Sequence, residues 1–173
     1  MKELLNLFYR QDMELILCGA FVCAVCFRQV WLRAGTRIWF RAACVLAMAF
    51  WCYVLALLTL LNRSPGSESR YFLMPLNYVW ELYLTGNEEV SHSMFMNAAL
   101  FFPAGLLLSA LADRALPRRR VVWSICLILA GTSLAVECCQ LLLEIGRFEI
   151  DDTLFNSLGA YMGTLVLWPE TPK

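Results

Sequence analysis

The residues of this sequence that could do chemistry are acidic, amide and hydroxyl side chains at helical spacing. Ser133, Glu137 and Gln140 stand at positions i, i+4 and i+7, so they share one face of a helix. Asp152 and Asn156 repeat the i, i+4 spacing further along the chain. A charge within a membrane-spanning helix costs at least about 2.5–3.5 kcal/mol on insertion scales, so it usually faces the bundle interior and has a function. The whole set is a candidate ligand site, in which Glu137 and Asp152 are the candidate catalytic acid or base.

Further polar residues extend this candidate site. Arg147 is the natural counter-ion for the two carboxylates, and Arg70 is a second candidate. Asn97 offers an amide at the same depth, although an interhelical hydrogen bond explains it equally well. Asp151 is equally well explained as an N-cap, because carboxylates satisfy the free amides at the start of a helix.

Other usual signs of a catalytic centre are absent from the sequence. No serine or cysteine nucleophile has a partnering histidine, and there is no glycine loop that would cradle phosphate. The one histidine, His92, is expected in a solvated loop without metal-ligand spacing around it. Cys23 and Cys26 have the spacing of a dithiol motif, but they lie in an apolar stretch with no second pair, which favours helix packing. We expect no metal and no cofactor.

Composition indicates which elements must position these residues. The chain has 173 residues, of which 60% are hydrophobic and 16% charged, and its formal net charge is zero. Soluble domains average roughly 45–50% apolar and about 25% charged residues, so the excess predicts burial in lipid. Zero net charge gives no indication of nucleic-acid binding. We therefore expect an all-α, polytopic membrane helix bundle, with residues 1–173 as a single membrane domain.

Five apolar stretches approach the roughly 20 residues that a helix needs to cross the hydrocarbon. They cover about residues 13–31, 39–61, 95–111, 121–143 and 153–168. Arginines gather in the loops after the first and third stretches, and such loops are cytoplasmic. The expected topology has the amino terminus outside, the carboxyl terminus inside and the polar site facing outside. The long loop 62–94 is expected to hold a re-entrant or interfacial segment, with Tyr78, Trp80 and Tyr83 at headgroup level.

Gly159 and Gly163 form a GxxxG motif in the last apolar stretch. Glycines at this spacing let a neighbouring backbone approach closely. The motif could serve packing within one bundle or dimerisation, so an oligomer is left open.

Three spaced blocks of the sequence resemble the VanZ-like family of membrane proteins. The first block is Ser133 to Gln140, followed by Gly146, Arg147, Glu149, Asp151, Asp152, Asn156, Gly159 and Gly163. The second is the stretch from Met96 to Gly105, with Asn97 and Pro103, which resembles that family's third-span motif. The third is Arg70 with Pro75, from which the chain departs at Phe72 and Leu76. The resemblance covers roughly residues 45–168.

This resemblance implies a bacterial plasma-membrane protein. The family's namesake gives low-level resistance to the glycopeptide antibiotic teicoplanin, and many relatives lie outside resistance clusters. A resistance role for this chain is therefore an inference by name.

Three functions fit these observations. The first is an envelope protein whose outer cavity binds a lipid headgroup, a lipid-linked cell-wall precursor or the lipid of a lipoglycopeptide antibiotic. The second is a membrane-embedded enzyme acting on a lipid-linked phosphate or sugar, with phosphate held by arginines. The third is a small transporter or flippase, which we rank last because a proton relay needs ionisable groups throughout the membrane.

Overall fold

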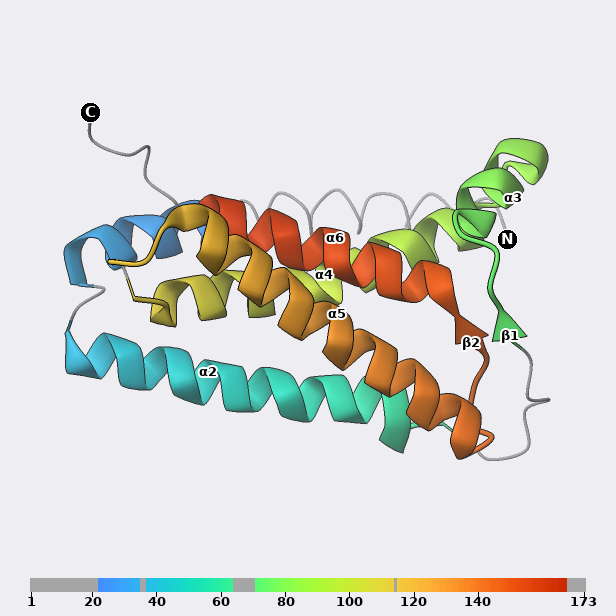
Figure 1. Ribbon diagram of the computed structural model, residues 1–173, viewed down its shortest axis with the longest axis horizontal. Coiled ribbons are helices and arrows are strands. Elements are labelled where there is room, and N and C mark those ends of the chain that lie inside the picture. The colour runs from blue at the N-terminus through green and yellow to red at the C-terminus, as the bar shows by residue number, and fades with distance from the viewer. Residues whose placement is uncertain (1–21, 35–36, 64–70, 114, 168–173) are drawn as a thin grey trace, which may run out of the picture.

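Among the residues that the structure describes, the longest helices are three apolar helices that lie lengthwise along the molecule (Figure 1). The computed structural model describes residues 22–34, 37–63, 71–113 and 115–167. Within these residues, three helices are long and apolar enough to cross a membrane. They are α2 (Ile38–Ala56) with its π-helical continuation η1 (Leu57–Leu61), α4 (Glu88–Leu111) and α5 (Arg118–Leu142). The chain is thus an all-α bundle of membrane type, as its composition predicts.

Shorter elements complete the described structure. Residues 22–34 are helical, and α6 (Ile150–Val166) has 17 residues, or about 25 Å at helical rise. The short helix α3 (Asn77–Thr85) lies between two of the long helices in the sequence. Strands β1 (Tyr71–Phe72) and β2 (Phe148–Glu149) pair in parallel, an arrangement that hydropathy does not predict.

Three of the five expected apolar stretches, 39–61, 95–111 and 121–143, coincide with these membrane-length helices, with one notable difference in their bounds. Helix α4 begins at Glu88 rather than near residue 95, because the Asn87 side chain accepts a hydrogen bond from the Glu89 amide at 3.0 Å and caps the helix. His92 therefore lies on α4, and the expectation that it occupies a solvated loop is wrong. Part of the first expected stretch, residues 13–21, lies outside the described residues.

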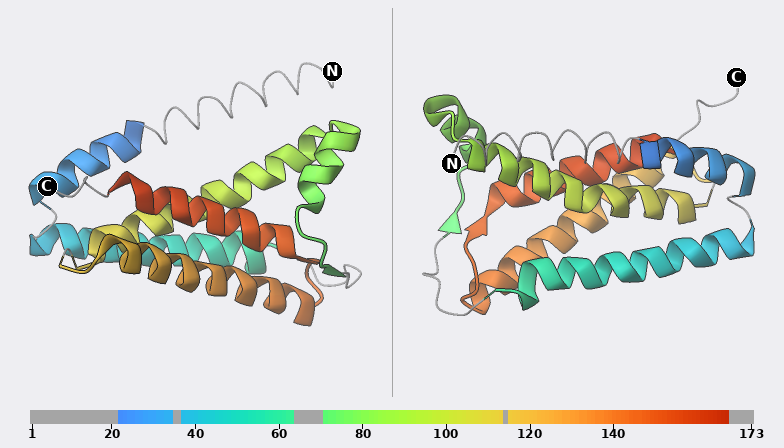
Figure 2. Two further views of the ribbon diagram at one scale, coloured as in Figure 1. Left: turned by 45° about the horizontal axis from the view of Figure 1, so that its top comes forward. Right: turned by 180° about the vertical axis from the view of Figure 1, so that it is seen from behind.

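Helices α4 and α6 lie side by side along the molecule, with backbones in close contact (Figures 1 and 2). A Cβ on Gly159 would lie 1.9 Å from the Ala98 carbonyl oxygen, and one on Gly163 would lie 2.2 Å from that of Phe102. Gly105 makes the same kind of close contact from the α4 side, since a Cβ added to it would lie 2.1 Å from the carbonyl oxygen of Ala160. The GxxxG motif is thus occupied by packing within the bundle.

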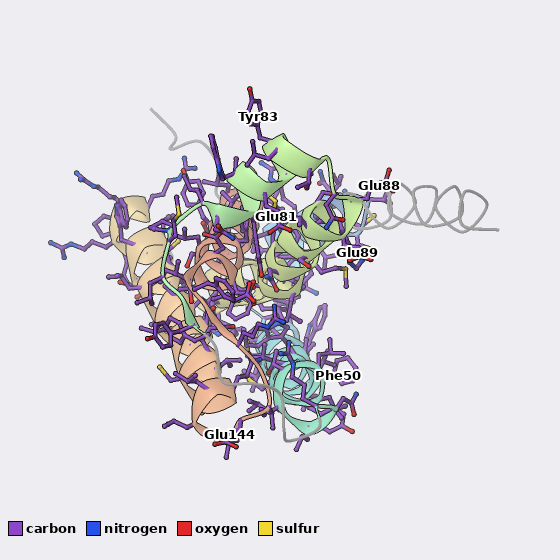
Figure 3. The ribbon with its side chains drawn as sticks, turned by 90° about the vertical axis from the view of Figure 1, so that its right-hand side faces the viewer. Phe50, Glu81, Tyr83, Glu88, Glu89 and Glu144 are labelled. Carbon is purple, nitrogen blue, oxygen red and sulfur yellow. The ribbon has the colours of Figure 1, made fainter. Side chains whose placement is uncertain are left out.

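The two ends of the bundle differ in composition. At one end, which we call the cavity end, lie α3, the paired strands and the last turns of α5 (Figure 3). The other, the arginine end, is where α5 begins with Arg118, Arg119 and Arg120. A core cluster that includes Trp31, Phe40 and Leu167 packs there. Glu137 lies roughly 28 Å along α5 from Arg118, at about 1.5 Å rise per residue, so it belongs to the cavity end.

Candidate functional site

A polar cavity of about 440 Å³ lies at the cavity end, between α3, α4, the start of α6 and the hairpin that precedes it. Both signs of charge and several neutral polar groups line it. Its lining residues are Arg63, Tyr78, His92, Ser93, Met96, Asn97, Ile145, Gly146, Arg147, Glu149 and Asp152. A volume of this size suits a small polar molecule or a lipid headgroup.

Asp152 is the centre of a hydrogen-bonded network in this cavity. Its Oδ1 accepts a bond from the Asn97 side-chain amide at 2.5 Å and lies 2.9 Å from the Tyr78 hydroxyl. The same hydroxyl also bonds to Oε2 of Glu149. Tyr78 is held in place by stacking on Phe155 of α6, with ring centroids 6.3 Å apart. Residues far apart in the sequence thus converge on one phenol oxygen.

Proton counting in this network has a chemical consequence. Burial, together with the charges of Asp152 and Glu149, holds the pKa of Tyr78 far above its usual range, so the phenol keeps its proton. A phenol has one proton to donate, yet two carboxyl oxygens face it. For both contacts to be full two-centre hydrogen bonds, the phenol oxygen has to accept one of them from a protonated carboxyl group. The cluster can therefore hold one carboxylic acid beside one carboxylate.

Asp151 is not among the residues that line the cavity, and it caps a helix other than its own. Its side chain is 2% exposed. The carboxylate accepts hydrogen bonds from the backbone amides of Leu76 at 2.6 Å and Tyr78 at 2.7 Å, which open α3. Leu76 adopts the left-handed conformation, with φ of 61°, at that point. The capping role that we weighed for Asp151 is therefore filled, but on α3 rather than on α6.

Glu137 also lies beneath the cavity. It is 3% exposed, and its Oε2 accepts a hydrogen bond from the Glu149 amide at 2.9 Å. Further down the same face of α5, the Ser133 hydroxyl accepts a bond from the Asn156 side-chain amide at 2.8 Å. These contacts tie α5 to α6 and to the segment that presents Glu149 to the cavity.

The Arg63 guanidinium lies beside Gly146, close to the side chain of Gln140. The Gln140 side-chain amide donates to the Thr59 carbonyl oxygen at 3.0 Å, which joins α5 to the π-helical turn of η1. A Cβ on Gly146 would lie 2.7 Å from Nη1 of Arg63, so only glycine leaves room for the guanidinium there. Arg63 lines the cavity together with Arg147, so it joins Arg147 as a candidate counter-ion for the carboxylates there.

The residues predicted from the sequence thus separate into two layers. Asn97, Arg147 and Asp152 line the cavity. A second group is buried below it and bonds to backbone or to other members of the group, namely Ser133, Glu137, Gln140, Asp151 and Asn156. Arg70 lies outside the described residues.

Sequence reasoning predicted three of the lining residues and missed the others as members of the site, among them the charged or polar Arg63, Tyr78, His92, Ser93 and Glu149. The sequence predicts Tyr78 at the membrane interface and His92 in a loop, and it gives Arg63 no role. No helical period relates these positions, and the resemblance of Glu149 to a family motif was the one usable signal. Among the described residues, no group of three or more His, Cys, Asp or Glu side chains could hold a metal ion.

Comparison with known proteins supports a family assignment that the sequence motifs suggest. No curated protein and no solved structure shows a significant match to the chain. The sequence pattern of the VanZ/LLP1 family, in contrast, matches residues 38–169, which include α2 to α6 and every described residue of the cavity. The match covers most of the chain, in agreement with the resemblance expected for residues 45–168. The chain belongs to the VanZ/LLP1 family.

Proposed function

We propose that the cavity binds the phosphate-bearing headgroup of a membrane lipid or lipid-linked cell-wall precursor. The observation that carries this proposal is the cavity itself, which has both signs of charge at one end of membrane-type helices. A soluble ligand would not need a site at the end of membrane-spanning helices, whereas a lipid headgroup lies at the boundary between the apolar layer and water.

The charges of the cavity suit such a headgroup. Arg63 and Arg147 can hold phosphate oxygens through charge-assisted hydrogen bonds. Glu149 and Asp152 can accept hydrogen bonds from sugar hydroxyls or amide groups of the same ligand. The buried layer below keeps these side chains in one arrangement, which lowers the ordering cost of binding.

The proposal includes an orientation. The loops at the arginine end carry the excess of basic residues, which supports a cytoplasmic position for that end. The cavity then faces the outside of a bacterial plasma membrane, where lipid-linked precursors and glycopeptide antibiotics are exposed.

Binding of undecaprenyl phosphate to the full-length protein in phosphatidylcholine nanodiscs tests the proposal. We expect Arg63→Gln to weaken binding about tenfold or more, since a hydrogen bond to a charged group contributes about 1.5–3 kcal/mol. Arg120→Gln, the same change on an exposed arginine of the other end, is the matched control. Equal affinities for the two variants, or no saturable binding by the wild type, would contradict the proposal.

The arrangement of Glu149 and Asp152 around the Tyr78 hydroxyl favours one second candidate function. This candidate is an enzyme that acts on a lipid-linked pyrophosphate. One carboxylate would remove a proton from water as its oxygen attacks phosphorus, and the neighbouring carboxylic acid would protonate the oxygen that leaves as the P–O–P bond breaks. Release of inorganic phosphate from undecaprenyl pyrophosphate by purified protein, abolished in Asp152→Asn, is the expected result. Absence of release by the wild type would leave binding alone.

The family's namesake suggests a physiological role for this binding, namely resistance to glycopeptide antibiotics. Expression of the wild type in a sensitive host should raise the inhibitory concentration of teicoplanin, and Glu137→Gln and Asp152→Asn at equal membrane levels should lower it again. If the wild type leaves the inhibitory concentration of teicoplanin unchanged, this chain does not confer resistance. If the variants protect as well as the wild type, the cavity has no part in resistance.

A further inference from the structure

A second cavity, of about 400 Å³, lies at the arginine end between the first turns of α5 and the last turns of α6. Arg118 and Arg119 line its mouth, and Trp123 and Tyr161 lie one or more turns deeper, with Leu165 beside them. The site described above uses none of these residues. Its lining passes from basic to aromatic and aliphatic along the direction in which the helices enter the apolar layer.

The surroundings of this cavity determine what can occupy it. Helix α5 is long and apolar enough to cross a membrane, and the Trp123 ring is 60% exposed on its surface. A large exposed ring one turn inside such a helix faces lipid rather than a soluble protein. The occupant must therefore be a membrane component with a polar end at the arginines and an apolar part along the rings.

Charge selects among membrane components. Two guanidiniums at one mouth attract phosphate oxygens, and basic pockets between membrane helices bind anionic headgroups. The α5 helix starts at Arg118 after Pro117, with no side-chain cap, so the positive end of its dipole points the same way. Zwitterionic lipids place a positive group beside these arginines, whereas anionic lipids do not.

We propose that this cavity binds an anionic glycerophospholipid, with its phosphate at Arg118 and Arg119 and one acyl chain along Trp123 and Tyr161. This site is distinct from the cavity at the opposite end and does not depend on its function. The lipid would fill the space between α5 and α6 and secure the arginine end of the bundle at the membrane surface.

Native mass spectrometry of the full-length protein, titrated with phosphatidylglycerol or phosphatidylcholine, tests the proposal. The wild type should retain phosphatidylglycerol about thirtyfold more tightly than phosphatidylcholine, because each of the two arginines contributes roughly 1 kcal/mol to the binding of an anionic headgroup. Arg119→Gln should reduce that preference about fivefold. Arg120→Gln makes the same charge change on a residue that does not line the cavity, and it should leave the preference near the wild-type value.

A variant that keeps every charge separates the cavity from diffuse attraction. Leu165→Trp fills the apolar part of the cavity and should weaken phosphatidylglycerol binding by a factor similar to Arg119→Gln. Equal losses in Arg119→Gln and Arg120→Gln, or full binding by Leu165→Trp, would overturn the proposal in favour of surface charge alone. Equal affinity of the wild type for both lipids would overturn it without recourse to any variant.

Discussion

The cavity end and the arginine end of the bundle both carry charge, but they hold it in opposite ways. At the cavity end, Glu137 and Asp151 are buried and their carboxylates accept hydrogen bonds from backbone amides. At the arginine end, Arg119 and Arg120 stand exposed on the first turn of α5. The first arrangement fixes side chains in place, whereas the second leaves them free to follow a ligand or a membrane surface.

Helices α5 and α6 therefore take part in two different kinds of site, one at each end of the bundle. Buried carboxylates are retained only when their hydrogen bonds are satisfied, so they position the residues above them with precision. Exposed arginines act through long-range attraction, which salt screens. We therefore expect the cavity end to select a ligand by geometry and the arginine end to select one by charge.

The contact between α4 and α6 runs between the two ends, and breaking it should give the largest effect. In Gly159→Val, side-chain carbons would overlap the Ala98 carbonyl and force the helices apart. We expect a loss of at least about 3 kcal/mol or failure to fold, seen as a lost monodisperse peak and a lowered melting temperature in detergent.

Gly131→Ala is the matched control, because nothing lies within 4 Å of its added Cβ. It should be neutral or stabilising by up to about 1 kcal/mol, since alanine favours a helix over glycine. A Gly159→Val protein as stable as Gly131→Ala would show that the two helices do not pack as described.

Asp151→Ala should release α3 at the cavity end alone. Two amides of the α3 start lose a charged acceptor, which should cost about 2 kcal/mol and speed hydrogen–deuterium exchange across Asn77–Thr85. Asp113→Ala at the arginine end removes an exposed carboxylate that accepts from one local amide, Ala115. That control should change exchange only next to itself, and similar exchange of α3 in both variants would remove the distinction between the ends.

Gly146→Ala should alter binding with little effect on stability. The added methyl meets the far end of the Arg63 side chain, which can swing away, so the fold should lose less than about 1 kcal/mol. Undecaprenyl phosphate should bind about tenfold more weakly, as in Arg63→Gln, because the guanidinium no longer reaches the cavity. Wild-type affinity in Gly146→Ala would mean that the contact between these residues has no part in the site.

The smallest expected effect is a difference between the two ends in how strongly salt weakens ligand binding. Raising ionic strength from about 50 to about 300 mM shortens the Debye length by more than half, which should weaken phosphatidylglycerol at the arginine end several-fold. The affinity of the cavity end for undecaprenyl phosphate should change by less than about twofold over the same range, because the contacts with the ligand are close and partly buried. Equal salt dependence, measured in the same titrations, would contradict the contrast between fixed and free charge.

Much of the fold was predictable because lipid burial imposes long apolar helices. The i, i+4 and i+7 spacing identified the face of α5 that carries Glu137, and its position near the end of that helix followed from helical rise. Spacing along one helix does not reveal contacts between distant segments. The hydrogen bond of Tyr78 to Asp152 and the contact of Arg63 with Gly146 depend on how the loops fold back on the bundle, which the spacing along one helix does not determine.

The most direct test of the central claim, that the cavity end binds a lipid-linked phosphate, is the location of a cross-link. Undecaprenyl phosphate with a photoreactive diazirine in its first isoprene unit would be irradiated with the full-length protein in nanodiscs, and labelled peptides mapped by mass spectrometry. We predict labels concentrated on residues 88–97 and 145–152, displaced by unlabelled undecaprenyl phosphate and reduced in Arg63→Gln. Labels spread along the lipid-facing side of α2, or gathered at the arginine end, would contradict the account.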